Sequence, residues 1–284
     1  MMLTDEVVNW LESNQYGRVV ANHPVGGGCI NNGERLETES GETFFLKTNP
    51  NAPGDMFARE AEGLDVLGKA GGPRVPKPYI FGQYYLLLED LAPASPQSNF
   101  WTKFGRQLAE MHNHVHPQFG FFHDNYIGST PQSNSWTDDG FQFFGEQRLM
   151  FQAKLAGRRN LLQADNIHRV EKLAKRLEEL VPHQPASLLH GDLWSGNAIA
   201  DVNGQPAIID PAAYYGWAEA ELAMTTLFGS FPGEFYSAYQ EVRKLEPGFR
   251  SRYAVYNLYH LLNHLNLFGR GYLSQVLGVL DRFV

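Results

Sequence analysis

The chain has 284 residues, of which 43% are hydrophobic, and its formal net charge at pH 7 is −8. This length and composition are typical of a globular protein with one large domain or two lobes, and the acidic balance without any basic run argues against a nucleic-acid-binding protein. No apolar run approaches the roughly 20 residues that span a bilayer, the first residues lack a secretory signal pattern, and the single cysteine, Cys29, fits a reducing compartment; we therefore expect a cytoplasmic protein that binds neither nucleic acid nor membrane.

Strands and turns dominate the predicted structure of the first 91 residues. The apolar stretches are short and are separated by glycine-containing turns, as in an antiparallel meander. Thr4 caps an opening amphipathic helix, and a second helix ends at the breaker Gly71-Gly72-Pro73. The predicted elements are a helix over 4–14, strands over 18–21, 34–38 and 43–48, a helix over 57–67, and strands over 79–82 and 84–89.

The character of the sequence changes at Ala92, where a Pro- and Ser-rich linker begins. Helices are predicted to dominate beyond this linker. We therefore expect an α+β protein with two lobes: a small β-rich N-lobe over 1–91 and a larger, mainly helical C-lobe over 92–284. A hinge near 89–92 and a cleft between the lobes complete the prediction. The predicted helices are 99–113, 141–156, 166–180, 219–227, 234–243, 251–267 and 273–284, with an irregular loop over 119–136.

Lys47 lies among apolar neighbours on the strand predicted over 43–48, where a lysine that points inward needs a counter-charge. Glu60, on the following helix, is the natural partner, and Glu62, on another face of that helix, is the competing candidate. In kinases such a Lys–Glu pair holds the α- and β-phosphates of the nucleotide. The alternative is that Lys47 is a solvent-facing strand residue and Glu60 a surface helix residue.

Two further segments of the N-lobe are candidates for nucleotide contacts. The glycine run that includes Gly27 and Gly28 is either a loop whose backbone N–H groups cover the phosphates or an ordinary hairpin turn. Glu89, Asp90 and Leu91 either offer backbone groups to adenine at the hinge or form the end of a strand. The sequence contains no GxxxxGK[ST] motif, which excludes a P-loop NTPase.

The most informative stretch, over residues 187–216, reads SLLHGDLWSGNAIADVNGQPAIIDPAAYYG. A short apolar strand delivers Asp192 onto a loop, Asn197 follows five residues later, and a hairpin with an Asn-Gly turn ends at Asp210. One carboxylate can therefore accept a hydroxyl proton, while an amide and a second carboxylate can hold Mg²⁺ against a nucleotide phosphate. We predict a phosphotransferase with Asp192 as the general base and with Asn197 and Asp210 as magnesium ligands.

Aromatic and histidine side chains around this stretch have simpler explanations. His190 is expected to support the loop by hydrogen bonding rather than to take part in the reaction. Trp194 either stacks on a sugar face or packs against the C-lobe, and the aromatic residues from Tyr214 to Trp217 either shape the acceptor pocket or pack. The histidines that alternate from His112 to His116 are joined by no acidic or cysteine cluster, so no metal site is expected there.

Several longer runs resemble the fructosamine/ketosamine 3-kinase family, and the resemblance extends over nearly the whole chain. The shorter pattern HGDxxxxN is shared with aminoglycoside phosphotransferases and choline kinases, which have the same protein-kinase-like fold, so the longer runs carry the family assignment. They are FFLKTN (44–49), FAREAEGLDVL (57–67), FGFFHDNYIGSTPQSNSW (119–136), HGDLWSGN (190–197), DPAAYYG (210–216), ELAMTTLFGSFP (221–232) and LLNHLNLFGR (261–270).

The resemblance implies ATP-dependent phosphorylation, with Mg²⁺, of the 3-hydroxyl of a ketosamine, which is a sugar joined to an amine by glycation. The unstable 3-phosphate then breaks down and frees the amine, so the implied role is repair of fructosamine- or ribulosamine-type adducts. By motif, Lys47 binds phosphates and Glu60 pairs with it. This chain departs from the family at Trp217, where members often have His or Asp, and at Glu221, where they have Asp; the first departure leaves the match of the acceptor pocket open.

Alternatives to this interpretation stay open at the level of sequence. The acceptor can instead be an aminoglycoside or another small alcohol. The chain can also be a non-catalytic nucleotide-binding scaffold, although a scaffold is expected to lose one of Lys47, Asp192, Asn197 and Asp210, which are all present. Cys29 falls where many family members carry a cysteine suspected of linking a dimer under oxidation, but we favour a small loop residue without a regulatory role. We expect a monomer or a homodimer.

Overall fold

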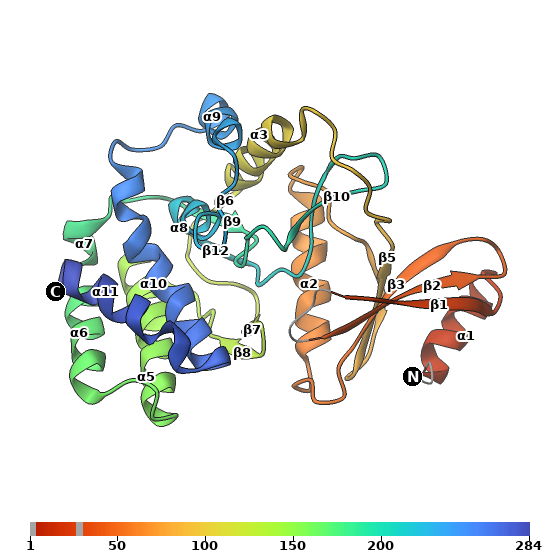
Figure 1. Cartoon of the computed structure of the whole chain (residues 1–284), viewed down its shortest axis with the longest axis horizontal. Coiled ribbons are helices and arrows are strands. Elements are labelled where there is room, and N and C mark those ends of the chain that lie inside the picture. The colour runs from red at the N-terminus through yellow and green to blue at the C-terminus, as the bar shows by residue number, and fades with distance from the viewer. Residues whose placement is uncertain (1–3, 27–30) are drawn as a thin grey trace.

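A five-stranded antiparallel sheet forms the N-terminal half of the computed structural model, which describes residues 4–26 and 31–284. Its strand order is β1-β2-β3-β5-β4, which confirms the predicted antiparallel meander for β1, β2 and β3, while β5 and not β4 pairs with β3. Helices α1 and α2 lie on opposite faces of the sheet (Figure 1). The elements of this half are α1 (Asp5–Ser13), β1 (Val19–Val25), β2 (Asn32–Thr38), β3 (Thr43–Thr48), α2 (Met56–Lys69), β4 (Pro78–Phe81) and β5 (Tyr85–Glu89).

Strand β3 shows how the two faces of this sheet are separated. Phe44 and Leu46 pack in the cluster that α1 covers, whereas Phe45 packs in the cluster that α2 covers. Successive side chains of a strand point to opposite faces, so Lys47 follows Phe45 onto the α2 side. In Figure 1 this side of the sheet faces the C-terminal half of the molecule. The alternation therefore directs a buried lysine, only 4% exposed, towards the other half.

The C-terminal half is mainly helical, and its 20-residue helix α10 packs against α5, α8 and α11. Residues of α10 are buried all round the helix from Tyr253 to Asn266, because helices cover it on several sides. With the sheet of the other half, this arrangement confirms the predicted α+β fold. No helix in the described part of the chain is both long and apolar enough to cross a membrane. The helices are α3 (Phe100–His112), α4 (Gly140–Gln142), α5 (Phe151–Arg158), α6 (Ala164–Lys175), α7 (Leu177–Leu180), α8 (Ala218–Met224), α9 (Gly233–Val242), α10 (Phe249–Phe268) and α11 (Leu273–Phe283), with a 3₁₀ turn η2 (Arg270–Tyr272).

The helix predicted over 141–156 is correct in place but wrong in type. Its first part is the π-helix η1 (Phe143–Met150), and α-helical geometry returns only in α5. Arg148, in the π-helical part, is completely buried and donates hydrogen bonds to the carbonyl of Ser133 at 2.6 Å and to Oδ1 of Asn134 at 2.7 Å. The wider π-helical turn thus coincides with a large buried cation that is anchored to the preceding loop.

Short strands shape the loops between the helices. β9 lies between β12 and β6, and β10 pairs with β11 in the hairpin that the Asn-Gly pair predicts, with Gly204 at a φ of 72°. Two predictions were wrong in detail: the loop over 119–136 contains the hairpin β7–β8, and the helix over 166–180 is interrupted at Arg176. These strands are β6 (Val115–His116), β7 (Asn125–Ile127), β8 (Thr130–Gln132), β9 (Ala186–Leu189), β10 (Ala198–Ala200), β11 (Pro206–Ile208) and β12 (Tyr214–Gly216).

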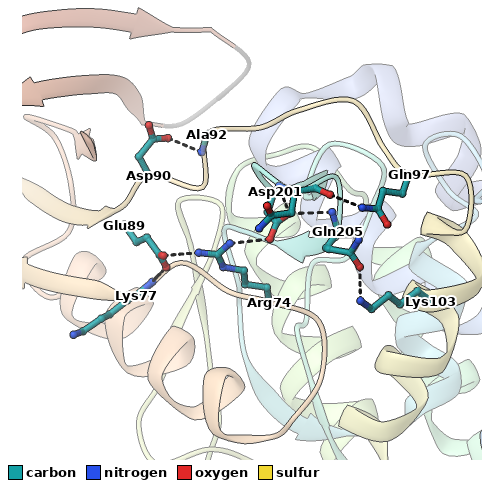
Figure 2. A network of polar contacts seen from close by, with 10 residues as sticks. Arg74, Lys77, Glu89, Asp90, Ala92, Gln97, Lys103, Asp201 and Gln205 are labelled. Atoms are coloured by element: carbon teal, nitrogen blue, oxygen red, sulfur yellow. Dashed lines mark hydrogen bonds and ion pairs between the residues drawn. The ribbon is translucent and has the colours of Figure 1, made fainter. Parts of the chain in front are cut away.

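Polar contacts around Arg74 join the two halves (Figure 2). Its guanidinium lies 2.5 Å from Glu89, at the end of β5, and 2.7 Å from Asp201, in the turn between β10 and β11. Its carbonyl accepts a hydrogen bond of 2.8 Å from the backbone N–H of Ile208, so the main chain also bridges the halves. The chain crosses between them at Ala92, whose φ of 43° is unusual for a residue other than glycine.

Candidate active site

A cavity of ≈ 830 Å³ lies between the two halves, and the residues predicted from the sequence converge on it. Gly26 lines this cavity, whereas Gly27, Gly28 and Cys29 lie outside the described residues, so the phosphate-loop prediction stays a prediction. Side chains of both halves contribute to the wall. The predicted site residues that line it are Lys47, Glu60, Glu89, Asp90, Leu91, Asp192, Asn197 and Asp210.

Lys47 is held between two carboxylates. Its Nζ lies 2.5 Å from Oε1 of Glu60 and 2.8 Å from Oδ1 of Asp210. Burial on its own lowers the pKa of Lys47, but the charges of Asp210 and Glu60 outweigh it and hold the pKa above its ordinary value. The ammonium therefore stays charged. Glu62, the competing partner, lies instead 2.9 Å from Arg59 on its own helix.

The loop that carries Asp192 has a backbone conformation that requires glycine at residue 191. Gly191 has a φ of 86°, and a β-carbon there would lie 2.0 Å from the carbonyl oxygen of Ala212. The backbone N–H groups of His190 and Gly191 donate to the carboxylate of Glu221 at 3.1 and 2.6 Å. Because a buried carboxylate needs such donors, Glu221 and the loop hold each other in place.

His190 supports this loop from within, as the sequence predicts. Its Nε2 lies 2.8 Å from the carbonyl oxygen of Ile209, and its Nδ1 accepts a hydrogen bond of 3.3 Å from the backbone N–H of Asp192. Burial lowers the pKa of His190, so the ring is neutral and Nε2 carries the proton. The ring thus fixes the backbone on both sides of the loop and is not itself placed as a proton acceptor.

A second buried histidine, His112, forms a hydrogen bond with the side chain of Glu221. Its Nε2 lies 2.9 Å from Glu221, and its Nδ1 lies 2.8 Å from the hydroxyl of Tyr239. Burial lowers the pKa of His112, so the neutral ring donates from Nε2 to the carboxylate and accepts from the tyrosine. The side chain is therefore used in a hydrogen-bond chain, and the described residues hold no His, Cys, Asp and Glu cluster suited to a metal ion.

Asp192 has the properties of a general base. Burial, followed by the charges of Asp210 and Glu221, raises the pKa of Asp192 to about 7, against the opposing effect of a hydrogen bond from Asn197. A carboxylate with a pKa near neutral pH accepts a proton more readily than an ordinary aspartate. The carbonyl oxygen of Asp192 also accepts a hydrogen bond of 2.8 Å from Nδ2 of Asn197, which joins the predicted base to a predicted metal ligand.

Asn197 and Asp210 supply oxygen donors of the kind that Mg²⁺ prefers. The Nδ2 of Asn197 is used by Asp192, which leaves the amide oxygen Oδ1 as the atom for a metal. The side chain of Asp210 is 44% exposed, although one of its oxygens contacts Lys47. Asp210 also has a φ of 60°, a conformation that costs energy outside glycine and that is common at functional sites. This donor set fits a divalent cation.

At the hinge, the side chains of Glu89 and Asp90 are engaged in ion pairs. Glu89 contacts Arg74, and Asp90, 2% exposed, lies 2.6 Å from Arg35. One oxygen of Asp90 also accepts a hydrogen bond of 2.9 Å from the backbone N–H of Ala92. Because these side chains are engaged, only the backbone groups of this segment are free to contact a nucleotide base, which is the contact that the sequence predicts.

The C-terminal half contributes an aromatic group to the cavity wall, and of this group only Trp194 was considered from the sequence. The ring of His264 lies 4.4 Å from that of Phe228 and 5.1 Å from that of Tyr272, and Trp194 lies 6.2 Å from Phe228; all four residues line the cavity. The signal in the sequence was Asn263-His264, a polar pair inside the apolar run of α10. Trp217, whose role was open, is 3% exposed and packs against other aromatic rings away from this cavity.

A buried amide network holds the segment that follows Asp210, and sequence reasoning missed it as well. Asn125 donates to the carbonyl of Ala213 at 2.8 Å, and Gln132 donates to the carbonyl of Ala212 at 3.0 Å. Gln132 also donates to Oδ1 of Asn125 at 2.7 Å. The run FGFFHDNYIGSTPQSNSW contains both amides, but nothing local indicates where they bond.

Comparison with known proteins agrees with this geometry. A family model described as fructosamine kinase matches residues 3–284. A protein named as a probable ketoamine kinase from Synechocystis is 43% identical over 91% of this chain and 88% of its own length. A chloroplastic protein-ribulosamine 3-kinase from Oryza sativa is 40% identical over 99% of this chain and 84% of its own. A solved structure assigned to the fructosamine-3-kinases, from Thermobifida fusca, has a TM-score of 0.88 and 32% identity, with 98% of each chain covered.

Proposed function

The chain belongs to the fructosamine kinase family, and we propose that it repairs glycated amines by phosphorylating them. It is a phosphotransferase that acts on a sugar hydroxyl of ketosamines. The family implies use of ATP, and we propose Mg²⁺ as the cation and the 3-hydroxyl of a fructosamine- or ribulosamine-type adduct as the acceptor. The 3-phosphate then breaks down and releases the amine. The nucleotide is bound by residues 1–91 and the acceptor by residues 92–284.

One observation supports this proposal most strongly: Lys47 with its carboxylate partners and Asp192 on its backbone-held loop line the same cavity. In-line phosphoryl transfer requires a cation at the phosphates and a base at the attacking hydroxyl in one enclosed space. A scaffold that only bound nucleotide would have no use for a carboxylate whose pKa is raised to about 7.

We derive the mechanism from these side chains. Lys47 contacts the phosphates, and Glu60 fixes the position of its ammonium. A Mg²⁺ ion held by Asn197 and Asp210 would neutralise charge on the phosphates. Asp192 orients the sugar 3-hydroxyl and accepts its proton while the hydroxyl oxygen forms a bond to the γ-phosphorus. The bond from the γ-phosphorus to the bridging oxygen breaks, ADP leaves with that electron pair, and Asp192 passes the proton to solvent.

The aromatic group of Trp194, Phe228, His264 and Tyr272 is where we place the acceptor. Sugar rings have apolar faces that stack on aromatic side chains, and the neighbouring Asn263 can hydrogen-bond hydroxyl groups. These residues belong to the C-terminal half of the molecule, as Asp192 does. The variants His264→Ala and Trp194→Ala are expected to raise KM for the acceptor and to leave KM for ATP unchanged.

The test is turnover of Mg-ATP with a panel of acceptors. The panel contains fructosamine, ribulosamine and erythrulosamine adducts, each on a free amino acid and on a protein lysine, together with one aminoglycoside. We expect kcat/KM for the best ketosamine to exceed that for the aminoglycoside by at least about tenfold. An aminoglycoside that is phosphorylated faster than every ketosamine would contradict the proposed substrate class.

Asp192→Asn tests the catalytic role separately. This variant is expected to lower kcat by about 10²–10⁴ while nucleotide affinity stays near that of the wild type. The matched control is Asp65→Asn, an exposed aspartate of α2, which should leave both unchanged. Near-normal turnover in Asp192→Asn would remove the general base from the mechanism, whereas loss of nucleotide binding alone would indicate a structural role.

The oligomeric state, the role of Cys29 and the cytoplasmic location stay predictions. Cys29 lies outside the described residues. A non-reducing gel of wild type and Cys29→Ser, with and without oxidant, tests a cysteine-linked dimer. A wild type that remains monomeric under oxidant would show that Cys29 is only a small loop residue.

A further inference from the structure

A second cavity, of ≈ 720 Å³, lies in the C-terminal half and shares no lining residue with the active-site cavity. Two helices form most of its wall, each with residues spaced three or four apart and therefore on one face. The segment after α8 and the start of α9 close it through Leu227, Phe231 and Tyr236. The helix faces are Arg250, Tyr253, Ala254, Asn257 and Leu261 of α10, and Gln275, Gly278, Val279 and Arg282 of α11.

Two buried polar atoms that belong to lining residues of this cavity lack hydrogen-bond partners among the described residues: the hydroxyl of Tyr253 and Oδ1 of Asn257. Tyr253 is 8% exposed and Asn257 6%. The Nδ2 of Asn257 donates to the carbonyl of Ala223 at 3.0 Å, which fixes the amide and identifies Oδ1 as an unused acceptor. Buried polar atoms without partners are rare and destabilising. Oδ1 of Asn257 can only accept a hydrogen bond, whereas the hydroxyl of Tyr253 can donate or accept one, so the two atoms together favour a ligand that carries hydroxyl groups.

The charge of the cavity wall is positive. Arg250 and Arg282 line it, neither forms an ion pair within the described part of the chain, and no carboxylate stands among the described lining residues. Burial raises the pKa of Tyr236 and of Tyr253, and the charge of Arg250 opposes the rise at both, so this guanidinium acts on the cavity interior. In a chain of net charge −8, two arginines without carboxylate partners indicate a site for an anion.

We propose that this cavity binds a small hydroxylated organic anion, of which a sugar phosphate is the representative class. The anionic group is bound by Arg250 and Arg282, and hydroxyl groups donate to Oδ1 of Asn257 and bond the hydroxyl of Tyr253. The carbon skeleton lies against the apolar side chains of the wall. The volume is within the usual range for small-molecule sites.

One segment contributes to both cavities and links the new site to the acceptor end of the active site. Leu227 lines the second cavity and Phe228, the next residue, lines the first. The carbonyl of Phe228 accepts a hydrogen bond of 3.1 Å from Ser195, which belongs to the loop of Asp192. A ligand that orders this segment is therefore expected to change KM for the acceptor more than KM for ATP, and this part rests on the proposed function.

Binding is measured first, by calorimetry with a hexose phosphate, the matching hexose and inorganic phosphate, so that the result does not depend on activity. We expect the hexose phosphate to bind at least about tenfold more tightly than the hexose. The double variant Arg250→Gln/Arg282→Gln should weaken it by at least about tenfold, whereas the control Arg158→Gln, at an exposed arginine of α5, should not. His264→Ala, in the active-site cavity, should leave the affinity unchanged.

Gly278→Leu blocks the cavity without a charge change. A β-carbon at Gly278 meets no atom within 4 Å, and the residue lies inside α11, so leucine there should raise helix propensity and retain the fold. We expect it to abolish binding at an unchanged or higher Tm. Absence of hexose phosphate binding to the wild type at millimolar concentration, unchanged affinity in Gly278→Leu, or loss of binding in His264→Ala would each overturn the proposal.

Discussion

Two layers of polar residues meet at the active site, and they differ in whether they line the cavity. The reactive layer lines the cavity, and its charges are only partly compensated: Asp210 is 44% exposed, and burial beside other carboxylates raises the pKa of Asp192 to about 7. The supporting layer is buried and does not line the cavity. We define the reactive layer as Lys47, Asp192, Asn197 and Asp210, and the supporting layer as His112, His190, Glu221 and Tyr239.

In the supporting layer the side chains form a continuous series of hydrogen bonds that ends at the catalytic loop. The hydroxyl of Tyr239 donates to His112, His112 donates to Glu221, and Glu221 accepts from the backbone of the catalytic loop. The difference between the layers indicates a division of labour. Reactive side chains keep charge and access for the substrates, and supporting side chains give up both in order to fix the backbone. Variants in the two layers should therefore lose activity and stability in different proportions.

Glu221→Ala should have the largest effect on stability. It leaves the backbone N–H groups of His190 and Gly191 buried without an acceptor, and it removes the partner of His112. We expect the free energy of unfolding to fall by about 3–5 kcal/mol, because three buried donors lose their acceptor and each unsatisfied donor costs about 1–3 kcal/mol. Because the loop also carries Asp192, kcat should fall too. Urea denaturation and steady-state kinetics on the same preparation measure both.

Glu178→Ala is the matched control for that variant, because its side chain is 76% exposed and should change the free energy of unfolding by less than about 0.5 kcal/mol. Glu221→Asp keeps the charge but shortens the reach, and it should fall between the two. A loss of less than about 1 kcal/mol in Glu221→Ala would mean that the supporting layer is not needed for the fold.

Lys47→Met should show the opposite proportion, with a large loss of activity and a smaller loss of stability. Activity is expected to fall by about 10²–10³, because the phosphates lose a positioned cation. Stability falls less than for Glu221→Ala because Glu60 can take up a proton: burial raises the pKa of Glu60, and Lys47 is the charge that opposes the rise.

The double variant Lys47→Met/Glu60→Gln separates the effect on stability from the effect on activity. It removes the carboxyl group that must take up a proton in the single variant, so the free energy of unfolding should recover while activity does not. Chemical denaturation and single-turnover kinetics on the two variants separate the effects. Recovery of activity in the double variant would show that Lys47 acts only through the stability of its pair with Glu60.

The reactive layer could be predicted from the sequence, whereas in the supporting layer only the role of His190 could. Asp192, Asn197 and Asp210 follow one another in a single loop and hairpin, and Lys47, whose inward position was one of two alternatives, was matched with Glu60 because an inward lysine needs a counter-charge. By contrast, His112 and Glu221 are 109 residues apart, and no local pattern announces that they bond. Glu221 was noted only as a departure from the family.

The same limit applies to the fold. The strand over 43–48 was predicted with its observed bounds, because local alternation determines it. The π-helix at Phe143–Met150 was not, because its cause lies in the tertiary burial of Arg148. Burial among Phe141 and Phe144 likewise decides that Trp217 packs rather than lines the acceptor pocket.

The pH dependence of activity should reflect the titration of the reactive layer, and of Asp192 in particular. Because burial and the charge of Asp210 raise the pKa of Asp192 to about 7, the base is protonated below that pH. We expect kcat/KM at limiting Mg²⁺ to fall about tenfold per pH unit below pH 7. More Mg²⁺ should move this limb to lower pH, since a cation at Asp210 cancels the charge that raises the pKa. Intrinsic fluorescence checks that the fold is retained, and a flat profile down to pH 5.5 would contradict the assignment.

Arg74→Gln should have the smallest effect, although the figure of the lobe contacts makes it look central (Figure 2). The side chains of Arg74 and Glu89 are 37% and 29% exposed, so water screens their pairing. Asp201 is only 5% exposed, but it keeps hydrogen bonds from the backbone N–H groups of Asn203 and Gln205, and the 2.8 Å backbone bond from Ile208 to residue 74 also survives. We expect a loss of about 1 kcal/mol or less in unfolding free energy and a KM for ATP within about threefold of wild type. A loss as large as that of Glu221→Ala would show that partly exposed ion pairs between the halves stabilise this fold as strongly as the buried hydrogen bonds of the supporting layer. The distinction between the two layers would then rest on their chemistry and not on burial.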